Sequence, residues 1–245
     1  MYMRNTHGQR LRLAALAAAG LAAVGMAATQ NAVADIVISE VDPAGSGTSA
    51  YTADWFELTN TGPAAVDITG WKMDDDSNKF ANAVALKGVT SIGAGKSVLF
   101  LEDTSAPSDA TLNQNFTAAW FGSNVPAGLT IGNYGGSGVG LGQGGDQVNI
   151  FNASGVNIAH VLFGASDAVH TFDNTAEANG VTLTQTSVVG VNGAFNSATS
   201  NEVGSPGVPI LPTPLPAAAW LLLSGFGLMG STLRRRAGRG ADVSV

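Results

Sequence analysis

The chain has no cysteine in its 245 residues and few charged residues. Without cysteine it has no disulfide bond, no thiolate metal ligand and no cysteine nucleophile. Charged residues make up 12% of the sequence, which is about half of the usual fraction. Glycine, in contrast, is abundant, with 32 residues. Short strands joined by glycine turns give this composition, so the sequence predicts an all-β protein.

Positive charge is also scarce outside the two ends of the chain. Residues 35–233 contain seventeen acidic residues and four lysines, which gives this part a net charge of −13. Binding to a phosphate backbone requires clustered Lys and Arg side chains. We therefore expect no nucleic-acid partner.

Three short strands are predicted in residues 35–71, at the start of a single β domain. In the second strand, Phe56 and Leu58 share one face. The opposite face of this strand carries Trp55, Glu57 and Thr59. This alternation predicts that one face is buried and the other faces water.

An ordered series of motifs resembles the lamin tail domain, an immunoglobulin-like β-sandwich found in nuclear lamins and in many bacterial surface proteins. In chain order the motifs are IVISEV at 36–41, DWFELTNTG at 54–62, VDITGW at 66–71, SIGAGKSVLFLE at 91–102, GGDQVNIFNASG at 144–155, VLFG at 161–164, GVTLTQ at 180–185 and GSPG at 204–207. The resemblance covers most of residues 35–207 and implies a β-sandwich. Glu40 and Glu57 match acidic positions of the family pattern, and we interpret them as structural.

The sequence departs from the family pattern at two places. Ala159 stands where many members carry an acidic residue, and residues 103–135 resemble an insertion. The insertion shows no sustained periodicity and is expected to form a long loop. Its aromatic residues include Phe116, Trp120 and Phe121. They fit either a platform for stacking sugars or a set of side chains that pin the loop to the sandwich.

Neither a nucleotide site nor a catalytic site is predicted. Residues 140–145 match the spacing G-x-G-x-x-G, but a strand pattern follows them where dinucleotide binding requires a helix. His160 lies in a predicted strand, and His170 lies in a polar stretch. Serine and aspartate are too frequent to nominate partners for either histidine, so we predict no catalytic residue and no cofactor.

A weak calcium site is one interpretation of the densest acidic run. Asp74, Asp76 and Asn78 follow the D-x-D-x-N spacing with which a calcium-binding loop begins. Lys79 replaces the turn glycine of an EF-hand, and Ala85 replaces its bidentate glutamate. The alternatives are a weaker calcium site completed by a neighbouring loop and a solvated acidic hairpin tip.

Residues 1–34 have the features of a signal peptide. Three arginines precede an apolar stretch at 13–28, and Ala32 and Ala34 provide the small residues of a cleavage site. Cleavage after Ala34 would begin the mature chain at the first predicted strand. A retained membrane anchor is the alternative.

The C-terminal part changes character after residue 207. Residues 208–216 form a proline-rich linker, 217–233 contain no charge, and 234–245 form a basic tail. As a helix, 215–233 would span roughly 28 Å, close to the thickness of a bilayer core. The arginines that follow predict a tail in the cytoplasm and a domain on the outside.

This C-terminal arrangement resembles the tripartite PEP-CTERM sorting signal in its VPLPA form. The motif residues are Pro214, Leu215, Pro216 and Ala217, and the basic cluster is Arg234, Arg235 and Arg236. The resemblance implies a Gram-negative bacterium in which signal peptidase and an exosortase process the chain at the inner membrane. Proteins with this signal are associated with exopolysaccharide and biofilm. A plain C-terminal anchor is the alternative.

Together these features predict an exported, surface-held β-sandwich without catalytic activity. It would act as a structural or adhesive module of the cell envelope or of an exopolysaccharide matrix, in contact with exopolysaccharide or envelope proteins. The alternatives are a calcium-dependent or glycan-binding module and, with less support, a secreted hydrolase.

Overall fold

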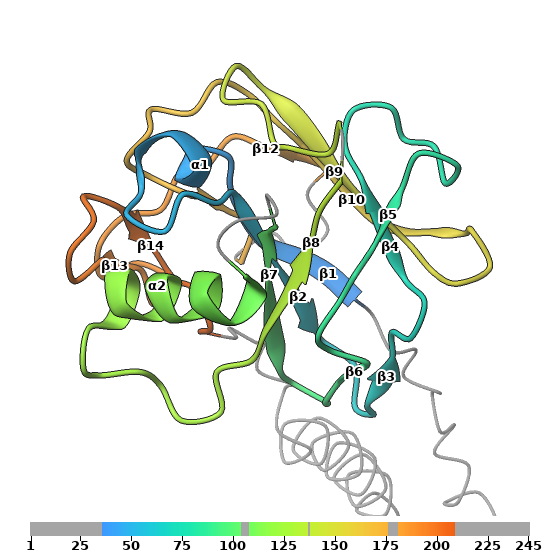
Figure 1. The fold of residues 1–245 in the computed structure, drawn as a ribbon, viewed down its shortest axis with the longest axis horizontal. Helices are drawn as coiled ribbons and strands as arrows, with labels where there is room; N and C mark the ends of the chain where they lie inside the picture. Colours follow the sequence, from blue (N-terminus) through green and yellow to red (C-terminus); the bar gives the residue numbers. More distant parts are fainter. Residues whose placement is uncertain (1–35, 104–107, 137, 176–180, 209–245) are drawn as a thin grey trace, which may run out of the picture. The chain divides into compact units, whose positions relative to one another are not determined.

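Two β-sheets form the body of the protein in a computed structural model, which describes residues 36–103, 108–136, 138–175 and 181–208 (Figure 1). The first sheet has the strand order β11-β1-β2-β7-β8, and the second has the order β12-β10-β9-β4-β5. Two small sheets pair β3 with β6 and β13 with β14. The predicted all-β sandwich is confirmed.

The elements have the following bounds in chain order: β1 (Ile36–Asp42), α1 (Gly45–Thr48), β2 (Trp55–Asn60), β3 (Val66–Asp67), β4 (Lys72–Asp74), β5 (Val84–Ala85), β6 (Ser91–Ile92), β7 (Ser97–Glu102), α2 (Asp109–Phe121), β8 (Ile131–Tyr134), β9 (Asp146–Phe151), β10 (Asn157–Phe163), β11 (Phe172–Asp173), β12 (Thr182–Leu183), β13 (Phe195–Asn196) and β14 (Val203–Gly204).

The main hydrophobic core lies between the two sheets. From the first sheet it receives Phe56 and Leu58, as the alternation in the sequence predicts, and from the second sheet it receives Val148 and Ile150. Phe56 stacks on Phe100 of the neighbouring strand with ring centroids 5.6 Å apart. Each large apolar side chain buried in this way contributes about 1.5–3 kcal/mol.

A β-bulge in β1 sets which side chains meet across the β1–β2 pair. Ile38 lies opposite Leu58, but the next paired residue is Glu40, which lies opposite Glu57. Ser39 is therefore the extra residue of the bulge. Without it, Ser39 would lie opposite Glu57, so the bulge places two carboxylates side by side on one face of the sheet.

The segment 103–135 is not a long loop, and that prediction was wrong. It contains helix α2 and strand β8, and β8 pairs in parallel with β7. Parallel neighbours require a long crossover connection, which is usually a helix. The buried apolar residues of α2 include Leu112, Phe116, Ala119 and Trp120. Their i, i+4, i+7, i+8 spacing is the helical signal that the sequence contains.

Helix α2 covers the face of the first sheet that was expected to face water. Trp55 of β2 packs against Phe116 and Trp120 of α2 in edge-to-face contacts, each with ring centroids 5.8 Å apart. Phe195 of β13 then packs on Trp120. Every residue of β2 is buried as a result. The aromatic residues of the insertion pin it to the sandwich, and their burial leaves no ring face for stacking a sugar.

The glycine-rich stretch before β9 does not resemble a nucleotide site. Gly142 and Gly145 form a turn, and β9 follows directly. The Asp54 carboxylate accepts a hydrogen bond from the Leu141 amide at 3.2 Å, and the Asp146 carboxylate accepts one from the Gly142 amide at 2.7 Å. Two amides of this loop are thus bound by carboxylates of the chain itself, and its described residues include no helix N-terminus that could receive a phosphate.

Several predictions fall outside the part of the chain that the structure describes. These are the signal peptide, the cleavage residues Ala32 and Ala34, the apolar segment 217–233 and the sorting residues. Within the described residues, none of the helices has both the length and the apolar character to span a bilayer.

The aromatic layer makes a testable contribution to stability. We expect Trp120→Ala to lower the free energy of unfolding by about 3–5 kcal/mol, because it empties a buried site and removes the indole hydrogen bond to Tyr51. Val189→Ala, at a side chain that is 51% exposed, should change it by less than about 0.5 kcal/mol. Chemical denaturation of the full chain in mild detergent would measure both variants. Equal effects would contradict the packing of α2 on the sheet.

Candidate functional site

Two buried glutamates lie at the centre of the first sheet's outer face. Glu40 and Glu57 are opposite each other in the β1–β2 pair, and they are 1% and 2% exposed. Both accept hydrogen bonds from residues 205–208, which we call the strap. The strap follows β14 and is the last described part of the chain.

Glu40 holds the beginning of the strap. Its Oε1 accepts hydrogen bonds from the Thr171 hydroxyl at 2.6 Å and from the Ser205 amide at 2.7 Å. Its Oε2 lies 3.1 Å from the Ser205 hydroxyl. Gly204, just before the strap, passes so close that a Cβ atom there would lie 2.7 Å from Glu40 Oε1 and 2.9 Å from the Trp120 ring. Glycine is thus required at this position.

Glu57 holds the end of the strap. Its Oε2 accepts a hydrogen bond from the Gly207 amide at 2.6 Å, and its Oε1 accepts one from the Ser39 hydroxyl at 2.7 Å. The Thr59 hydroxyl donates to Ser39 at 2.8 Å and also contacts the Ser97 hydroxyl. The bulge residue Ser39 therefore has a function in the site, since it satisfies a buried carboxylate.

A second acidic cluster fixes the chain just before β14. The Tyr51 hydroxyl accepts hydrogen bonds from the indole N–H groups of Trp55 at 3.1 Å and Trp120 at 3.2 Å. It lies 2.8 Å from Glu202 Oε1 and 3.2 Å from Asp42 Oδ2. Because a hydroxyl has one proton, it donates to the nearer carboxylate, that of Glu202. This contact ties the segment before the strap to α2 and β2.

Burial raises the pKa of Glu40, Glu57 and Asp42. Burial, together with the charge of Glu57, raises the pKa of Glu40 from 4.5 to about 8. Burial also raises the pKa of Glu57, although hydrogen bonds from Ser39 and Gly207 oppose the shift. The pKa of Asp42 is raised by burial and then by the charge of Glu202. The salt bridges within the described residues are Lys87–Asp103 and His170–Asp167, so no cation neutralises these acids there.

The two histidines do not form a catalytic site with the described residues. His160 is exposed on β10. His170 Nδ1 lies 2.7 Å from Asp167 Oδ2, and the same carboxylate also accepts hydrogen bonds from the His170 and Val169 amides through Oδ1. The pair therefore belongs to a local turn at the surface. No hydroxyl nucleophile contacts either ring in the ranges that the structure describes.

The three predicted calcium ligands differ in burial and in their hydrogen bonds. Asp74 is fully buried, and its Oδ2 accepts hydrogen bonds from the Ser77 hydroxyl and the Lys79 amide, both at 2.7 Å. Its Oδ1 is buried without a hydrogen-bond partner. Asn78 instead accepts a hydrogen bond from Asn157, and Asp76 is exposed. Among the residues described, no three His, Cys, Asp or Glu side chains are grouped so that they could hold a metal ion.

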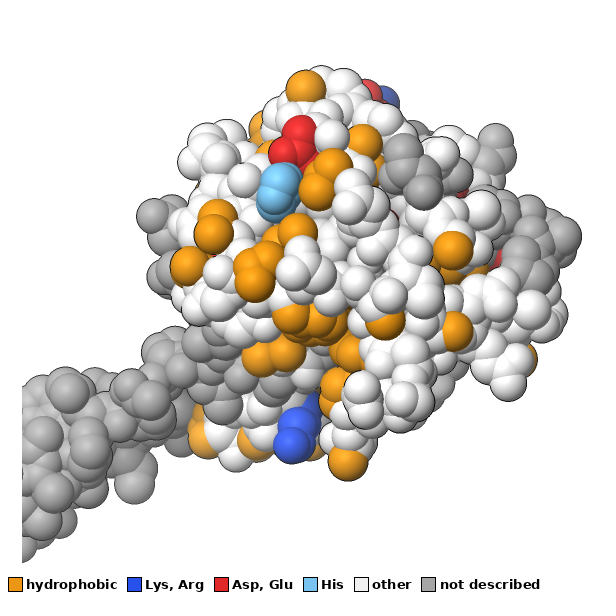
Figure 2. All heavy atoms as spheres, turned by 90° about the vertical axis from the view of Figure 1, so that its left-hand side faces the viewer, with side chains coloured by type: hydrophobic (Ala, Val, Ile, Leu, Met, Phe, Trp, Pro, Cys, Tyr) orange, Lys and Arg blue, Asp and Glu red, His pale blue; other side chains and the backbone are white. Residues whose placement is uncertain are grey.

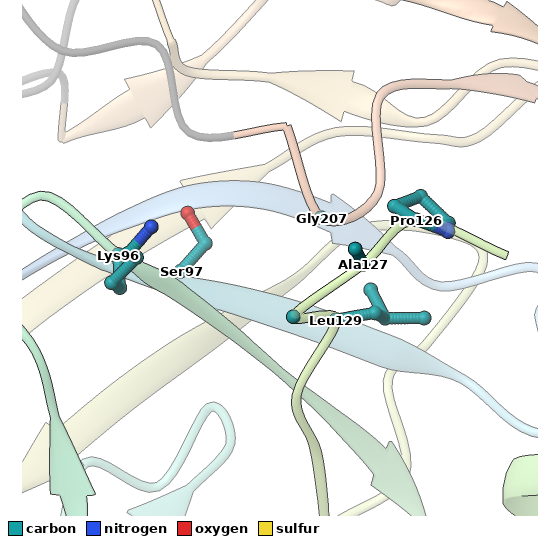
Figure 3. A pocket seen from close by; sticks show the side chains of 7 residues that line it. Lys96, Ser97, Pro126, Ala127, Leu129 and Gly207 are labelled. Carbon is teal, nitrogen blue, oxygen red and sulfur yellow. The ribbon is translucent and has the colours of Figure 1, made fainter.

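A small pocket lies beside the end of the strap (Figure 3). Its volume is about 90 Å³, well below the roughly 300 Å³ of a ligand pocket. Lys96 and Ser97 lie together at one end of the pocket, and Pro126, Ala127 and Leu129 lie toward the other. The pocket is too small for an ordinary ligand site.

The sequence identified part of this arrangement. Glu40 and Glu57 were predicted to be structural, and their buried hydrogen bonds confirm this. Asp42, Tyr51 and Glu202 were missed. Asp42 ends a strand whose other residues are mostly apolar, and an acid in that place was a weak signal of a buried carboxylate. No local signal existed for Glu202, because its hydrogen bond with Tyr51 joins residues far apart in the chain.

The raised pKa values predict that the protein is less stable in alkali. Between about pH 4.5 and pH 8 the unfolded chain loses the Glu40 proton while the folded chain keeps it, so stability falls by up to about 1.4 kcal/mol per pH unit for each such group. We expect the melting temperature of the full chain to fall from pH 5 to pH 9 in differential scanning fluorimetry. Glu40→Gln should flatten this profile, whereas Asp76→Asn at an exposed acid should not. A flat profile for the unmodified protein would contradict the burial of ionisable carboxylates.

Comparison with known proteins agrees with the geometry. The lamin tail domain family matches residues 29–165, which is more than half of the chain. This match ends just after β10, so the described sandwich continues beyond it through β11, β12 and the strap. A search of curated proteins finds no match. The lamin tail domain is an immunoglobulin-like, non-catalytic domain, and this chain belongs to the lamin tail domain family.

Proposed function

We propose that the protein is an exported, surface-held β-sandwich that acts as a structural or adhesive module of the cell envelope or of an exopolysaccharide matrix. One observation carries this proposal. The acidic and aromatic side chains that catalysis or sugar stacking would require are buried in contacts that hold the fold together. Such a module would act through its surface and its attachment rather than through a reactive centre.

The surface supports a packing role. Figure 2 shows a face on which charged side chains are few and hydrophobic side chains are scattered. Within the described part of the chain, the exposed large hydrophobic residues are Val and Ile, with no aromatic residue among them. Three of these valines, Val188, Val189 and Val191, lie close together in the sequence. Small aliphatic groups fit contact with envelope proteins better than stacking on sugar rings.

The sequence of the two ends supports attachment at the membrane. We propose that signal peptidase removes residues 1–34 and that an exosortase recognises Pro214–Ala217 together with the arginine cluster at 234–236. The apolar segment 217–233 would hold the protein in the inner membrane of a Gram-negative bacterium until it is processed. The protein would then reach the cell surface or the extracellular matrix.

Replacement of the basic cluster tests the sorting proposal. We expect a variant with Arg234, Arg235 and Arg236 all changed to Gln to accumulate as unprocessed precursor, because the positive charge that orients the tail is lost. Arg239→Gln, outside the cluster, should be processed normally. Mass spectrometry of the protein's C-terminus from its native host would distinguish the forms. Normal processing of the triple variant would favour a plain anchor over exosortase sorting.

A calcium-dependent module is a second candidate, and the buried Asp74 supports it. Its Oδ1 atom has no hydrogen-bond partner, although burial of an unpaired carboxylate oxygen is costly. A bound cation with further oxygen ligands would satisfy this atom. A secreted hydrolase has the least support, because neither described histidine contacts a hydroxyl nucleophile.

Calcium titration decides this second candidate. If calcium binds at Asp74, millimolar calcium should raise the melting temperature of the full chain by several degrees, and Asp74→Asn should abolish the increase. Asp109→Asn, at the start of α2, should leave the increase intact. An unchanged melting curve in calcium would remove the calcium proposal.

A further inference from the structure

We propose that the strap, residues 205–208, is an alkaline-sensitive latch that lies closed on the first sheet while Glu40 and Glu57 are protonated and opens when they ionise. Opening would let water reach both carboxylates from the side that the strap covers. It would also add about 13 Å of extended chain between the sandwich and residue 209. The latch depends on how the four residues of the strap lie against the side chains of Glu40 and Glu57. It goes beyond the proposed structural role.

The strap is bound to the sheet through these carboxylates. Its amides at Ser205 and Gly207 donate to Glu40 and Glu57, and the Ser205 hydroxyl also contacts Glu40. The Val208 amide donates back to the Ser205 carbonyl within the strap itself. Among the described residues, these carboxylate contacts are the hydrogen bonds that join the strap to β1 and β2.

The residues before the strap have a separate anchor. The Val203 amide donates to the Val169 carbonyl at 2.8 Å, and the Val203 carbonyl accepts a hydrogen bond from the Thr171 amide at 3.0 Å. Gly204 pairs with Phe195 in the β13–β14 sheet. Opening can therefore stop at Gly204, because β14 keeps its own backbone partners when the two carboxylate contacts are lost.

A protonated Glu40 fits the closed strap. In this form Oε2 carries the proton and donates a hydrogen bond to the Ser205 hydroxyl oxygen, 3.1 Å away. Oε1 continues to accept hydrogen bonds from the Thr171 hydroxyl and from the Ser205 amide. Every polar atom of the carboxyl group is then satisfied. Once Glu40 and Glu57 are both ionised, two negative charges lie opposite each other in a buried pair, which is strongly unfavourable.

The groups around the pair do not offset its charge. Glu40 and Glu57 face the hydroxyls of Ser39, Thr59, Thr171 and Ser205 from β1, β2, the segment before β11 and the strap. Across the β1–β11 pair, Glu40 lies opposite the buried acid Asp173. The next ionisable groups nearby are the acids Asp42, Asp54 and Glu202 together with Tyr51. Lys96 lines the pocket beside Gly207 and forms no ion pair in the described structure, while the ring of His170 is bound to Asp167.

Water offers the ionised carboxylates a better environment than the closed strap does. Burial is the largest cause of the raised pKa of each glutamate, and it outweighs the hydrogen bonds that the strap donates. Opening removes the strap from above both side chains, so that water can reach the charged forms from that side. The closed state is therefore favoured at low pH, and the open state gains population as pH rises toward 8.

Hydrogen exchange on the full chain in mild detergent tests the latch. We expect the protection factors of the amides in 205–208, corrected for the intrinsic pH dependence of exchange, to fall at least about tenfold between pH 6 and pH 8. Amides of β9 and β10, in the second sheet, should keep their protection over the same range. A variant with Glu40→Gln and Glu57→Gln should hold the protection of the strap constant with pH.

Three outcomes would overturn the latch. The strap of the unmodified protein could keep constant protection from pH 6 to pH 8, or the strap and β9–β10 could lose protection together, which would indicate global unfolding instead. A pH-dependent loss that persists in the double glutamine variant would place the titrating group elsewhere. Gly207→Ala supplies an independent variant: it strains a residue with φ +75° whose added Cβ would lie 2.5 Å from Leu129, so it should lower strap protection already at pH 6.

Discussion

Burial of both faces of strand β2 is the constraint on which the rest of the structure depends. One face packs Phe56 and Leu58 against the second sheet. The other face places Trp55 under α2, and it places Glu57 under the strap. A strand buried on both sides gains more apolar contact than one half-open to water, and this gain matters in a chain without disulfide bonds. It also requires that every polar group on the second face find a partner inside the protein.

The buried acids follow from that requirement. Glu57 lies on the face that α2 and the strap cover, and the bulge at Ser39 places Glu40 beside it. Carboxylates in such a place are stable only if they are protonated or hydrogen-bonded, and here they receive hydroxyl and amide donors from several segments. The acids therefore connect the chain's C-terminal segment to its first two strands. If the C-terminal end holds the protein at a surface, as we propose, this connection links the strap before the attached end to the centre of the fold.

The charge distribution has a related consequence. The body of the chain has a net charge of −13, yet several of its acids are buried and one face shows few charges (Figure 2). In the envelope or matrix that we propose as its location, a face with few charges would make contact with neighbours easier. Among the described residues, the exposed large hydrophobic side chains are aliphatic rather than aromatic, which favours packing over specific recognition of a sugar.

The sequence alone determined the all-β class, the family, the core alternation of Phe56 and Leu58 and the structural role of Glu40 and Glu57. These follow from residue types and from a spacing of two, which are properties of short segments. The sequence also contained the spacing of helix α2, but the insertion was taken to lack sustained periodicity and was therefore predicted to be a loop. Only the tertiary structure decided that α2 covers β2, that the bulge aligns the two glutamates and that Tyr51 meets Glu202. Each of these contacts joins segments that are distant in the chain, and no local pattern records which distant segment will supply the partner of a buried side chain.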